Sequence, residues 1–472
     1  MTGASKPPLT EDRGAAAELY SHRLASWWAA PADVRAVLCG RLTQLLAAGS
    51  LALFDDGESS AWLRLTPTQW SEVAVGDYVA IVPQRLPSSA AAAPVPGTLA
   101  FCAAELQRLS RPSDALSFLS PGSDWYRLQE AGRRRARGLQ VRSQFVSAIR
   151  AFFAAREFIE IEAPLQVPSP GLELHLAAFA TEPGGRFLIT SPEYQCKRLL
   201  AGGLRRIYSL GKVFRAGEAG PHHNPEFTML EWYRAFAGWE AVADDVAALC
   251  AELAAARPGG DGQPRLSYRG RTLDLALPWP KLSVAEAMSR YAGVTLRGDE
   301  TVDELRQALH AAGHHPSEPS DRPPSWDELF FPVFLDHVEP CLMQPPGQDR
   351  SAPLRPVVLY DWPLHLCALA RPRPDNAAVV ERFEAYVAGV ELCNGFGELC
   401  DPVEQRRRLE LDAQKRSERG LPVYPQDERF LSALAAGMPP SAGVALGVDR
   451  LLMLLSDAEH IREVLPFASD EL

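Results

Sequence analysis

Apolar and polar positions follow two different patterns along the chain. Between residues 34 and 110 the apolar residues form short β-prone runs, among them 50–54 and 76–82. Asp55-Asp56-Gly57 follows the first of these runs, and an Asp-Gly pair between two strands is a strong hairpin signal. Short strands at this spacing predict a small β-barrel or sandwich over residues 31–112.

A helical pattern begins at residue 139. Val141, Phe145, Ile149 and Phe152 recur at helical spacing, which predicts an amphipathic helix over 139–156. Apolar and acidic residues then alternate over 158–164 and end at Pro164, which predicts a strand.

The rest of the chain divides at changes in composition. We expect a flexible, Ala-rich arm over 1–30 with a short helix near 15–29, a long loop over 88–97, and a linker over 113–138. Proline and glycine interrupt 257–350, which indicates an insertion within a catalytic domain spanning 139–472. Further helices are predicted over 240–256, 302–312 and 406–419.

Composition narrows the class of protein. The 472 residues are 46% hydrophobic and 23% charged, as in soluble globular proteins. No apolar run reaches the roughly 20 residues that span a bilayer, and the start lacks a basic and then apolar leader, so we expect a cytoplasmic protein with no membrane partner. Eight cysteines without a CxxC pair argue against a zinc ribbon or redox motif. The net charge of −11 disfavours a general DNA binder, which would show a basic face.

Four segments combine polar and apolar residues in a way that suits chemistry: 190–200, 214–234, 381–399 and 441–454. The glycine-rich signatures GxGxxG and GxxxxGK[ST] are missing, and so is the GxSxG elbow. An enzyme that uses a nucleotide would therefore hold its phosphates in another way.

Several residues in these segments suit nucleotide chemistry. Arg215 and Arg450 carry permanent, fork-shaped charges that suit phosphate oxygens. Glu384 and Glu391, seven residues apart in a β-prone stretch, could hold Mg²⁺ between protein and phosphates, although such a pair in isolation is more often solvated. Phe227 could stack on an adenine or belong to the core.

Three carboxylates stand inside otherwise apolar strings: Glu193, Glu231 and Glu398. A buried carboxylate needs a partner. A cationic amino-acid ligand would supply one, and an internal ion pair with Arg198 or Arg234 is the alternative.

The order and wording of these segments resemble class II aminoacyl-tRNA synthetase catalytic domains of the lysyl type. Within that class the chain is most similar to the family of elongation factor P–lysine ligases. Residues 156–164 resemble the first motif of the class, 214–234 the second and 442–451 the third. The resemblance covers about 139–472, with 257–350 poorly matched, and implies an α+β fold: an antiparallel sheet flanked by helices, in a homodimer. Residues 31–112 resemble a small OB-like barrel.

The resemblance implies a role for each matching residue. Arg215, Arg450 and Glu391 would act in catalysis, and Glu384 and Glu391 would carry Mg²⁺. The ATP site would comprise Arg215, Glu218, His223, Asn224, Phe227, Glu391, Leu392, Gly447 and Arg450. The site for lysine or β-lysine would comprise Ser191, Pro192, Glu193, Glu231, Tyr233, Asn394, Phe396, Glu398 and Ala445.

Three positions depart from the usual motifs. The second motif normally reads Phe-Arg-x-Glu, but here Gly217 takes the place of the glutamate and Glu218 comes one residue late. Either a shifted loop recruits Glu218, or ATP binding is weakened. Glu157 replaces a glycine of the first motif, which predicts a turn residue. Ala445 stands where lysyl-tRNA synthetases commonly carry glycine and protein-modifying relatives carry alanine.

Three functions remain open on this basis. The first is an ATP-dependent ligase that joins lysine or β-lysine to a lysine of elongation factor P. The second is a lysyl-tRNA synthetase, which the OB-like extension favours. Six arginines against seven acidic residues over 33–112 give this barrel little of the positive groove that an RNA-binding OB surface needs, which favours the first function. The third is a catalytically silent, synthetase-like binding protein, suggested by Gly217.

Overall fold

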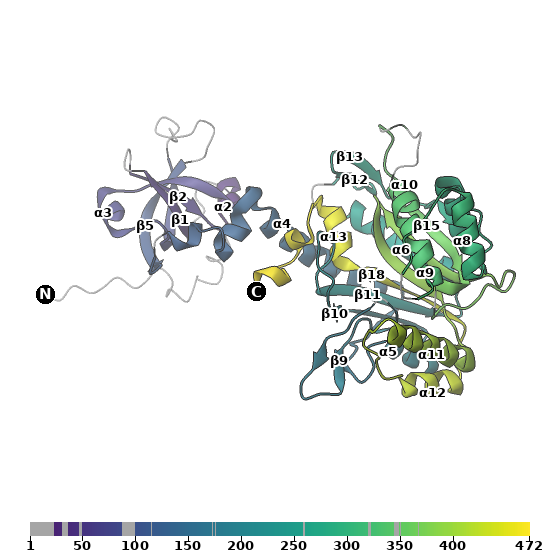
Figure 1. Ribbon diagram of the computed structural model, residues 1–472. Coiled ribbons are helices and arrows are strands. Elements are labelled where there is room, and N and C mark those ends of the chain that lie inside the picture. The colour runs from purple at the N-terminus through teal and green to yellow at the C-terminus, as the bar shows by residue number, and fades with distance from the viewer. Residues whose placement is uncertain are drawn as a thin grey trace. The chain divides into compact units, whose positions relative to one another are not determined.

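The computed structural model describes residues 23–30, 36–46, 50–86, 100–114, 116–171, 173–174, 176–257, 260–319, 322–343, 349, 351–366 and 368–472 (Figure 1). The chain forms two compact units, residues 1–137 and 138–472. The first 22 residues of the predicted arm and the predicted loop over 88–97 lie outside the described residues. Within the described ranges, every helix is too short or too polar to cross a membrane.

The first unit is a closed barrel with the strand order β1-β2-β3-β5-β4, which confirms the predicted OB-like domain (Figure 1). β2 and β3 pair across the predicted hairpin turn, where Gly57 has φ +92°. Its elements are α2 (Leu24–Ala29), β1 (Leu38–Leu46), β2 (Leu51–Asp55), β3 (Ser60–Arg64), α3 (Pro67–Glu72), β4 (Tyr78–Arg85) and β5 (Ala100–Ser110).

Both ends of this unit differ from the prediction. Leu24 and Trp27 of α2 are buried in the barrel core, so residues 24–29 belong to the barrel and not to an arm. The predicted linker over 113–138 contains η1 (Ser117–Leu119) and is helical from residue 124, in α4 (Asp124–Ala154). Residues 124–138 hold no proline and many good helix formers, so the predicted helix over 139–156 is the second half of a longer one.

The second unit is built on an eight-stranded sheet with the order β14-β15-β16-β17-β18-β11-β10-β6. β14 and β6 pair in parallel with their neighbours and the other pairs are antiparallel. The predicted strand over 158–164 is reduced to the two residues of β6. The strands are β6 (Ile159–Glu160), β10 (Arg206–Phe214), β11 (Glu226–Ala235), β14 (Lys281–Ser283), β15 (Val357–Pro363), β16 (Val379–Val387), β17 (Val390–Gly397) and β18 (Ser441–Gly447). A small separate sheet contains β7 (Gln166–Val167), β8 (Ala180–Thr181) and β9 (Arg186–Leu188).

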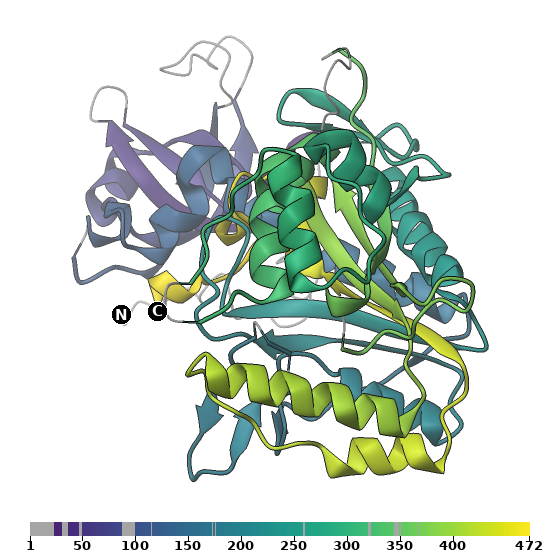
Figure 2. The ribbon, with the colours of Figure 1, turned by 45° about the vertical axis from the view of Figure 1, so that its right-hand side comes forward.

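One face of the large sheet packs against α6 (Trp239–Ala255), α13 (Val448–Ser456) and the end of α4. Strand residues alternate between faces, so Leu230 and Trp232 enter this core while Glu231 and Tyr233 point to the opposite face, which we call the site face. Three helices cover the site face at β11: α5 (Glu193–Ala201), α11 (Pro402–Glu418) and α12 (Glu428–Ala436) (Figures 1 and 2).

The predicted insertion covers the other end of the site face. It adds β14 to the sheet edge, and its helices share a core with Leu359, Trp362 and Tyr386 of β15 and β16. α8 confirms the helix predicted over 302–312. The remaining elements are β12 (Arg265–Tyr268), β13 (Arg271–Asp274), α7 (Val284–Ala287), η2 (Met288–Ala292), α8 (Val302–Ala311), α9 (Trp326–Val333), η3 (Phe334–Val338), α10 (Glu339–Met343), η4 (Leu364–Leu366), η5 (Ile461–Val464) and η6 (Ser469–Glu471).

Candidate active site

A cavity of about 370 Å³ opens on the site face between the two groups of covering helices. Segments that lie more than 150 residues apart in the sequence meet here, because β11, β17 and β18 are neighbours in the sheet. Twelve of the residues predicted for the site line this cavity: Arg215, Glu218, His223, Asn224, Phe227, Glu384, Glu391, Leu392, Asn394, Ala445, Gly447 and Arg450.

Small residues on the central strand make the hollow. Ala445 of β18 pairs with Glu231 on one side and Asn394 on the other. Gly443 lies in the same way between Tyr233 and Phe396, and a Cβ at this glycine would stand 2.3 Å from the Tyr233 ring. Larger side chains therefore project from β11 and β17 on either side of a shallow central strand.

Glu231 is one of the enclosed groups that the sequence predicted as a substrate ligand. It is 1% exposed and accepts hydrogen bonds from Tyr233 Oη at 2.5 Å and from Ser191 Oγ at 2.7 Å. Burial, and then the charge of Glu193, raises the pKa of Glu231 to about 8. Ser191 also accepts from the backbone N–H of Glu193 at 3.0 Å, and Pro192 precedes the first turn of α5.

Glu193 and Glu398 pair with a cation of the chain itself. The Lys197 ammonium, 0% exposed, bonds to Glu193 one turn earlier on α5 and lies 2.6 Å from Oε2 of Glu398. Burial raises the pKa of Glu398 to about 7. The internal pairing considered for Arg198 or Arg234 is thus made by Lys197, while Arg234 pairs with Asp245 at 3.2 Å.

Arginines stand at the phosphate-binding end that the sequence predicted. The Arg215 guanidinium lies 5.3 Å from the centre of the Phe227 ring. Arg450 donates to the backbone carbonyl of Glu391 at 2.8 Å and to Nε2 of His223 at 2.5 Å. Burial, and then the charge of Arg450, lowers the pKa of His223, so this imidazole is neutral at pH 7 and can accept that bond. Both guanidinium groups also face the cavity and are open to an anion.

The departures in the motifs are accommodated by the backbone. Gly217 adopts φ +82°, and the next residue, Glu218, lines the cavity 3.9 Å from Arg215. The late glutamate therefore stands beside Arg215, the arginine predicted to bind phosphate, which weakens the argument from Gly217 for a catalytically silent protein. Glu157 has φ +60°, the left-handed turn conformation that favours glycine.

Glu384 and Glu391 lie on the two strands of the hairpin β16–β17. Glu384 is buried, pairs with Arg382 and accepts from Tyr386 Oη at 2.9 Å, whereas the Glu391 side chain is 42% exposed. Burial raises the pKa of Glu384 to about 7. Oxygen donors of this kind suit Mg²⁺. The described residues contain no group of three potential metal ligands, so an ion here would draw further oxygens from a bound nucleotide.

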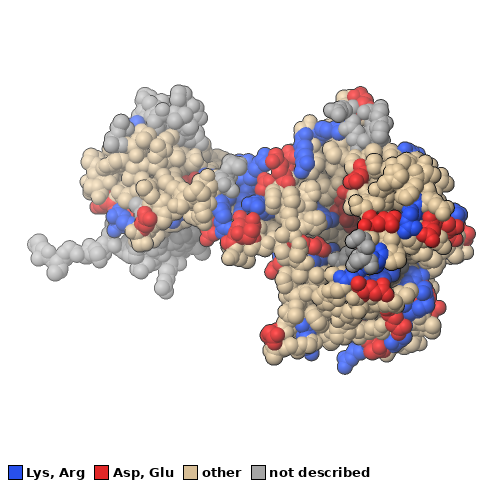
Figure 3. All heavy atoms as spheres, viewed as in Figure 1, with Lys and Arg blue, Asp and Glu red and all other residues tan. Residues whose placement is uncertain are grey.

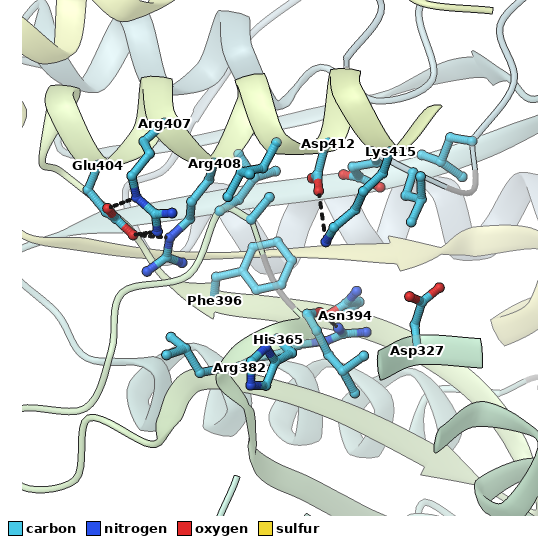
Figure 4. Close-up of a pocket in the computed structure, with 18 of the residues that line it drawn as sticks. Asp327, His365, Arg382, Asn394, Phe396, Glu404, Arg407, Arg408, Asp412 and Lys415 are labelled. Atoms are coloured by element: carbon cyan, nitrogen blue, oxygen red, sulfur yellow. Dashed lines mark hydrogen bonds and ion pairs between the residues drawn. The ribbon is translucent and has the colours of Figure 1, made fainter. Parts of the chain in front are cut away.

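A second cavity, of about 430 Å³, adjoins the first under α11 (Figure 4). Arg407, Arg408 and Lys415 project from α11 toward Phe396 and Asn394 (Figure 4). Glu404 pairs with both arginines at 2.7 Å and Asp412 lies 3.7 Å from Lys415, so three cations of this wall face two carboxylates. Asn394 lines both cavities, which gives the site floor a second opening.

The sequence interpretation missed several residues of the site. Lys197 could have been found, because it follows Glu193 by four residues, the spacing at which opposite charges pair on a helix such as α5. Arg142 gave no signal, since it comes from a distant helix: it pairs with Asp449 and donates to Thr228 Oγ1 at 2.6 Å. Asp449 accepts from the Thr228 N–H at 2.8 Å, which ties the start of α13 to β11 next to Arg450.

Comparison with known proteins gives matches over the same region. The sequence model of the tRNA synthetases class II (D, K and N) matches residues 126–471. An "Elongation factor P--(R)-beta-lysine ligase" of Haemophilus influenzae (strain PittGG) is 39% identical over 342 residues, 71% of this chain and 95% of the relative. A "Lysine--tRNA ligase" of Moorella thermoacetica is 36% identical over 330 residues, 69% of this chain and 64% of that protein. Another, from Dehalococcoides mccartyi (strain CBDB1), is 31% identical over 458 residues, 91% of this chain and 86% of its own length.

Proposed function

The chain belongs to the class II tRNA synthetases of the D, K and N group and is an aminoacyl ligase, and we propose that it activates lysine or β-lysine with ATP and transfers it to a lysine side chain of elongation factor P. The relative of 39% identity, covered over 95% of its length, bears the name of that reaction. Ala445, the residue that this resemblance associates with protein-modifying members, lies between Glu231 and Asn394 on the site floor.

Three buried carboxylates determine which amino acid the site binds: Glu193, Glu231 and Glu398. Together they hold one internal cation, Lys197, so the site has a surplus of negative charge. A substrate with two ammonium groups would balance it, whereas a neutral side chain would leave a buried carboxylate without a partner.

In the first step a carboxylate oxygen of the amino acid attacks the α-phosphorus of ATP and the bond to pyrophosphate breaks. Arg215 holds the α-phosphate and offsets the charge that develops on it. Phe227 stacks under the adenine beside Asn224 and His223, Leu392 and Gly447 leave room for the nucleotide, and Arg450 grips the far phosphates. The site contributes positioning and charge, and no side chain forms a covalent intermediate.

Glu384 and Glu391 fit a Mg²⁺ ion held jointly with the phosphates, and such an ion would supply Lewis-acid stabilisation of phosphate charge. In the second step the ε-amino nitrogen of the acceptor lysine attacks the carbonyl carbon of the aminoacyl-adenylate, loses a proton, and AMP leaves.

The barrel supports a protein acceptor over tRNA because three of the arginines that the structure describes there are already engaged. Arg41 lies against the rings of Tyr78, Phe118 and Trp125, with centroids 4.3–4.7 Å away. Arg85 donates to three backbone carbonyls. Arg111 pairs with Asp77 at 2.7 Å. In the view of Figure 3 the described barrel surface is mostly uncharged, unlike the basic groove of an RNA-binding OB domain.

One observation favours the second candidate, a lysyl-tRNA synthetase. A match over 91% of this chain has to extend well into the first 137 residues, so a protein named Lysine--tRNA ligase shares much of the barrel as well. A gel shift with tRNA separates the candidates, because a protein-modifying enzyme should not retain tRNA at physiological salt.

Exchange of labelled pyrophosphate into ATP tests the activation step. Exchange should depend on lysine or β-lysine and on Mg²⁺, and norleucine should not support it. If neither lysine isomer drives exchange while the protein is folded and binds ATP, the proposed activity is wrong. The homodimer implied by the family stays a prediction for light scattering.

A further inference from the structure

Lys197 is the most enclosed cation of the site region, and the reaction proposed above gives it no role. Its side chain is 0% exposed, with Nζ bonded to Glu193, 2.6 Å from Oε2 of Glu398 and 6.0 Å from the centre of the Phe430 ring. Taking an ammonium group out of water is costly unless carboxylates surround it. A leucine or methionine would fill an apolar site under α5 without that cost, so the charge at this position needs a reason.

The number of charges around Lys197 supplies that reason. Three carboxylates face one another here from three elements: Glu193 on α5, Glu231 on β11 and Glu398 just after β17. Tyr233 and Ser191 add hydroxyl groups, which carry no charge. Arg371, whose charge also acts on Glu398, pairs with Glu381 at 2.6 Å. A fourth carboxyl group, that of Glu173, interacts with Glu193 and Lys197, but it also faces the charges of Arg215 and Arg382 and so is not counted with the three. One cation against three carboxylates leaves two negative charges for a ligand.

The hydrogen bonding of the Glu398 carboxylate also indicates that the site accepts a cationic ligand. Both carboxylate oxygens of Glu398 are buried without a geometrically formed hydrogen bond within the described part of the chain, and Oε2 alone has an ion-pair partner, the Lys197 ammonium at 2.6 Å. Buried carboxylate oxygens are rarely left unpaired. Lys197 therefore pairs with one oxygen of Glu398, and the other, which lies beside Gly443, keeps its capacity to accept a hydrogen bond from an ammonium group.

We infer that Lys197 is a resident counter-ion that sets the net charge of the amino-acid site at minus two. In this way it makes the site selective for amino acids with two ammonium groups. The inference rests on the proposed activation of lysine or β-lysine. Without Lys197, the three carboxylates would be neutralised only by a ligand with three positive charges, or one of them would keep its proton. Without one of the carboxylates, the site would match an amino acid with a single ammonium group.

Charge-compensating variants test this role. Lys197→Met leaves three carboxylates with no resident cation, and its KM for lysine in pyrophosphate exchange should rise at least tenfold at pH 7. Glu193→Gln leaves one surplus negative charge. It should lower the ratio of kcat/KM for lysine to kcat/KM for norleucine at least tenfold. The double variant Glu193→Gln/Lys197→Met has two carboxylates and no internal cation, so the preference for lysine should return to within a few-fold of the unmodified protein.

Calorimetry of lysine binding in two buffers of different ionisation enthalpy supplies a second readout. Binding should release protons from the empty site, because burial raises the pKa of Glu231 and Glu398. Lys197→Met should release no more protons than the unmodified protein, because one of its three carboxyl groups stays protonated when lysine is bound, and the double variant should match the unmodified protein.

Each outcome separates the inference from the proposed function. If the unmodified protein shows neither exchange nor binding with lysine or β-lysine, the proposed function fails. If it is active but the double variant is no better than Lys197→Met, with all variants folded by circular dichroism, Lys197 is a structural residue and the inference is overturned. An unfolded Lys197→Met variant leaves the comparison between Glu193→Gln and the double variant to decide in the same way.

Discussion

Replacing Glu231 by glutamine should stabilise the fold and disable the enzyme. The Glu231 carboxyl is buried, and its pKa is raised from an ordinary 4.5 to about 8. Between those two pH values the unfolded chain releases the proton while the folded chain keeps it. The buried carboxyl group therefore leaves the free energy of unfolding unaffected below pH 4.5 and lowers it progressively as the pH rises toward 8.

The magnitude follows from that interval. At 1.36 kcal/mol for each pH unit above 4.5, the free energy of unfolding is lowered by about 3 kcal/mol at pH 7 and by about 0.7 kcal/mol at pH 5. Glutamine avoids this cost but weakens the hydrogen bonds from Ser191 and Tyr233, which are worth about 1 kcal/mol. The variant should gain about 2 kcal/mol at pH 7, a Tm increase of about 3 °C for the second unit, and nothing at pH 5.

Activity should move in the opposite direction. A hydrogen bond to a charged group contributes about 1.5–3 kcal/mol, so losing the carboxylate should raise the KM for lysine roughly 10- to 150-fold. Thermal unfolding at both pH values and pyrophosphate exchange measure the two effects. Glu226→Gln is the matched control, since Glu226 lies on the same strand with its side chain 53% exposed. A Glu231→Gln variant that is less stable at pH 7, or equally stabilised at pH 5 and pH 7, would refute the reasoning.

Three other changes give clear expectations. Glu391→Gln should abolish adenylate formation with Tm unchanged, because it removes an exposed oxygen that we propose as a ligand for Mg²⁺, and full turnover would exclude Glu391 from the mechanism. Deleting residues 1–112 should leave pyrophosphate exchange intact, since the second unit has its own core, and loss of exchange in a folded truncation would count against this view of the barrel. Ala445→Gly should change the preference between lysine and β-lysine about tenfold, because one methyl group in a pocket is worth about 1–3 kcal/mol, and an unchanged preference would show that this methyl does not meet the substrate.

The four chemical segments and their convergence could be predicted because short strings such as 222–234 and 441–451 carry both strand alternation and site residues. The register that places Ala445 between Glu231 and Asn394 then fixes most of the cavity floor. The small barrel was equally predictable, since its turn residues and alternating strands are local signals.

Features that depend on distant packing could not be read in the same way. Lys197 has the helical spacing of an ordinary surface pair with Glu193, and residues distant in sequence, among them Glu398 and Phe430, enclose it. Arg142 reaches Asp449 across more than 300 residues of sequence. The start of α4 was mistaken for a linker because a helix with a mixed polar and apolar surface has little periodic signal.

The identity of the acceptor tests the central claim most directly. Purified protein, Mg-ATP and labelled lysine or β-lysine would be incubated with elongation factor P and, in parallel, with tRNA, and the label in each would be counted after separation. Label in elongation factor P, lost when its acceptor lysine is replaced by arginine, is the result that the proposed function predicts. Label in tRNA alone would contradict it and would make the chain a lysyl-tRNA synthetase whose barrel serves tRNA despite its engaged arginines.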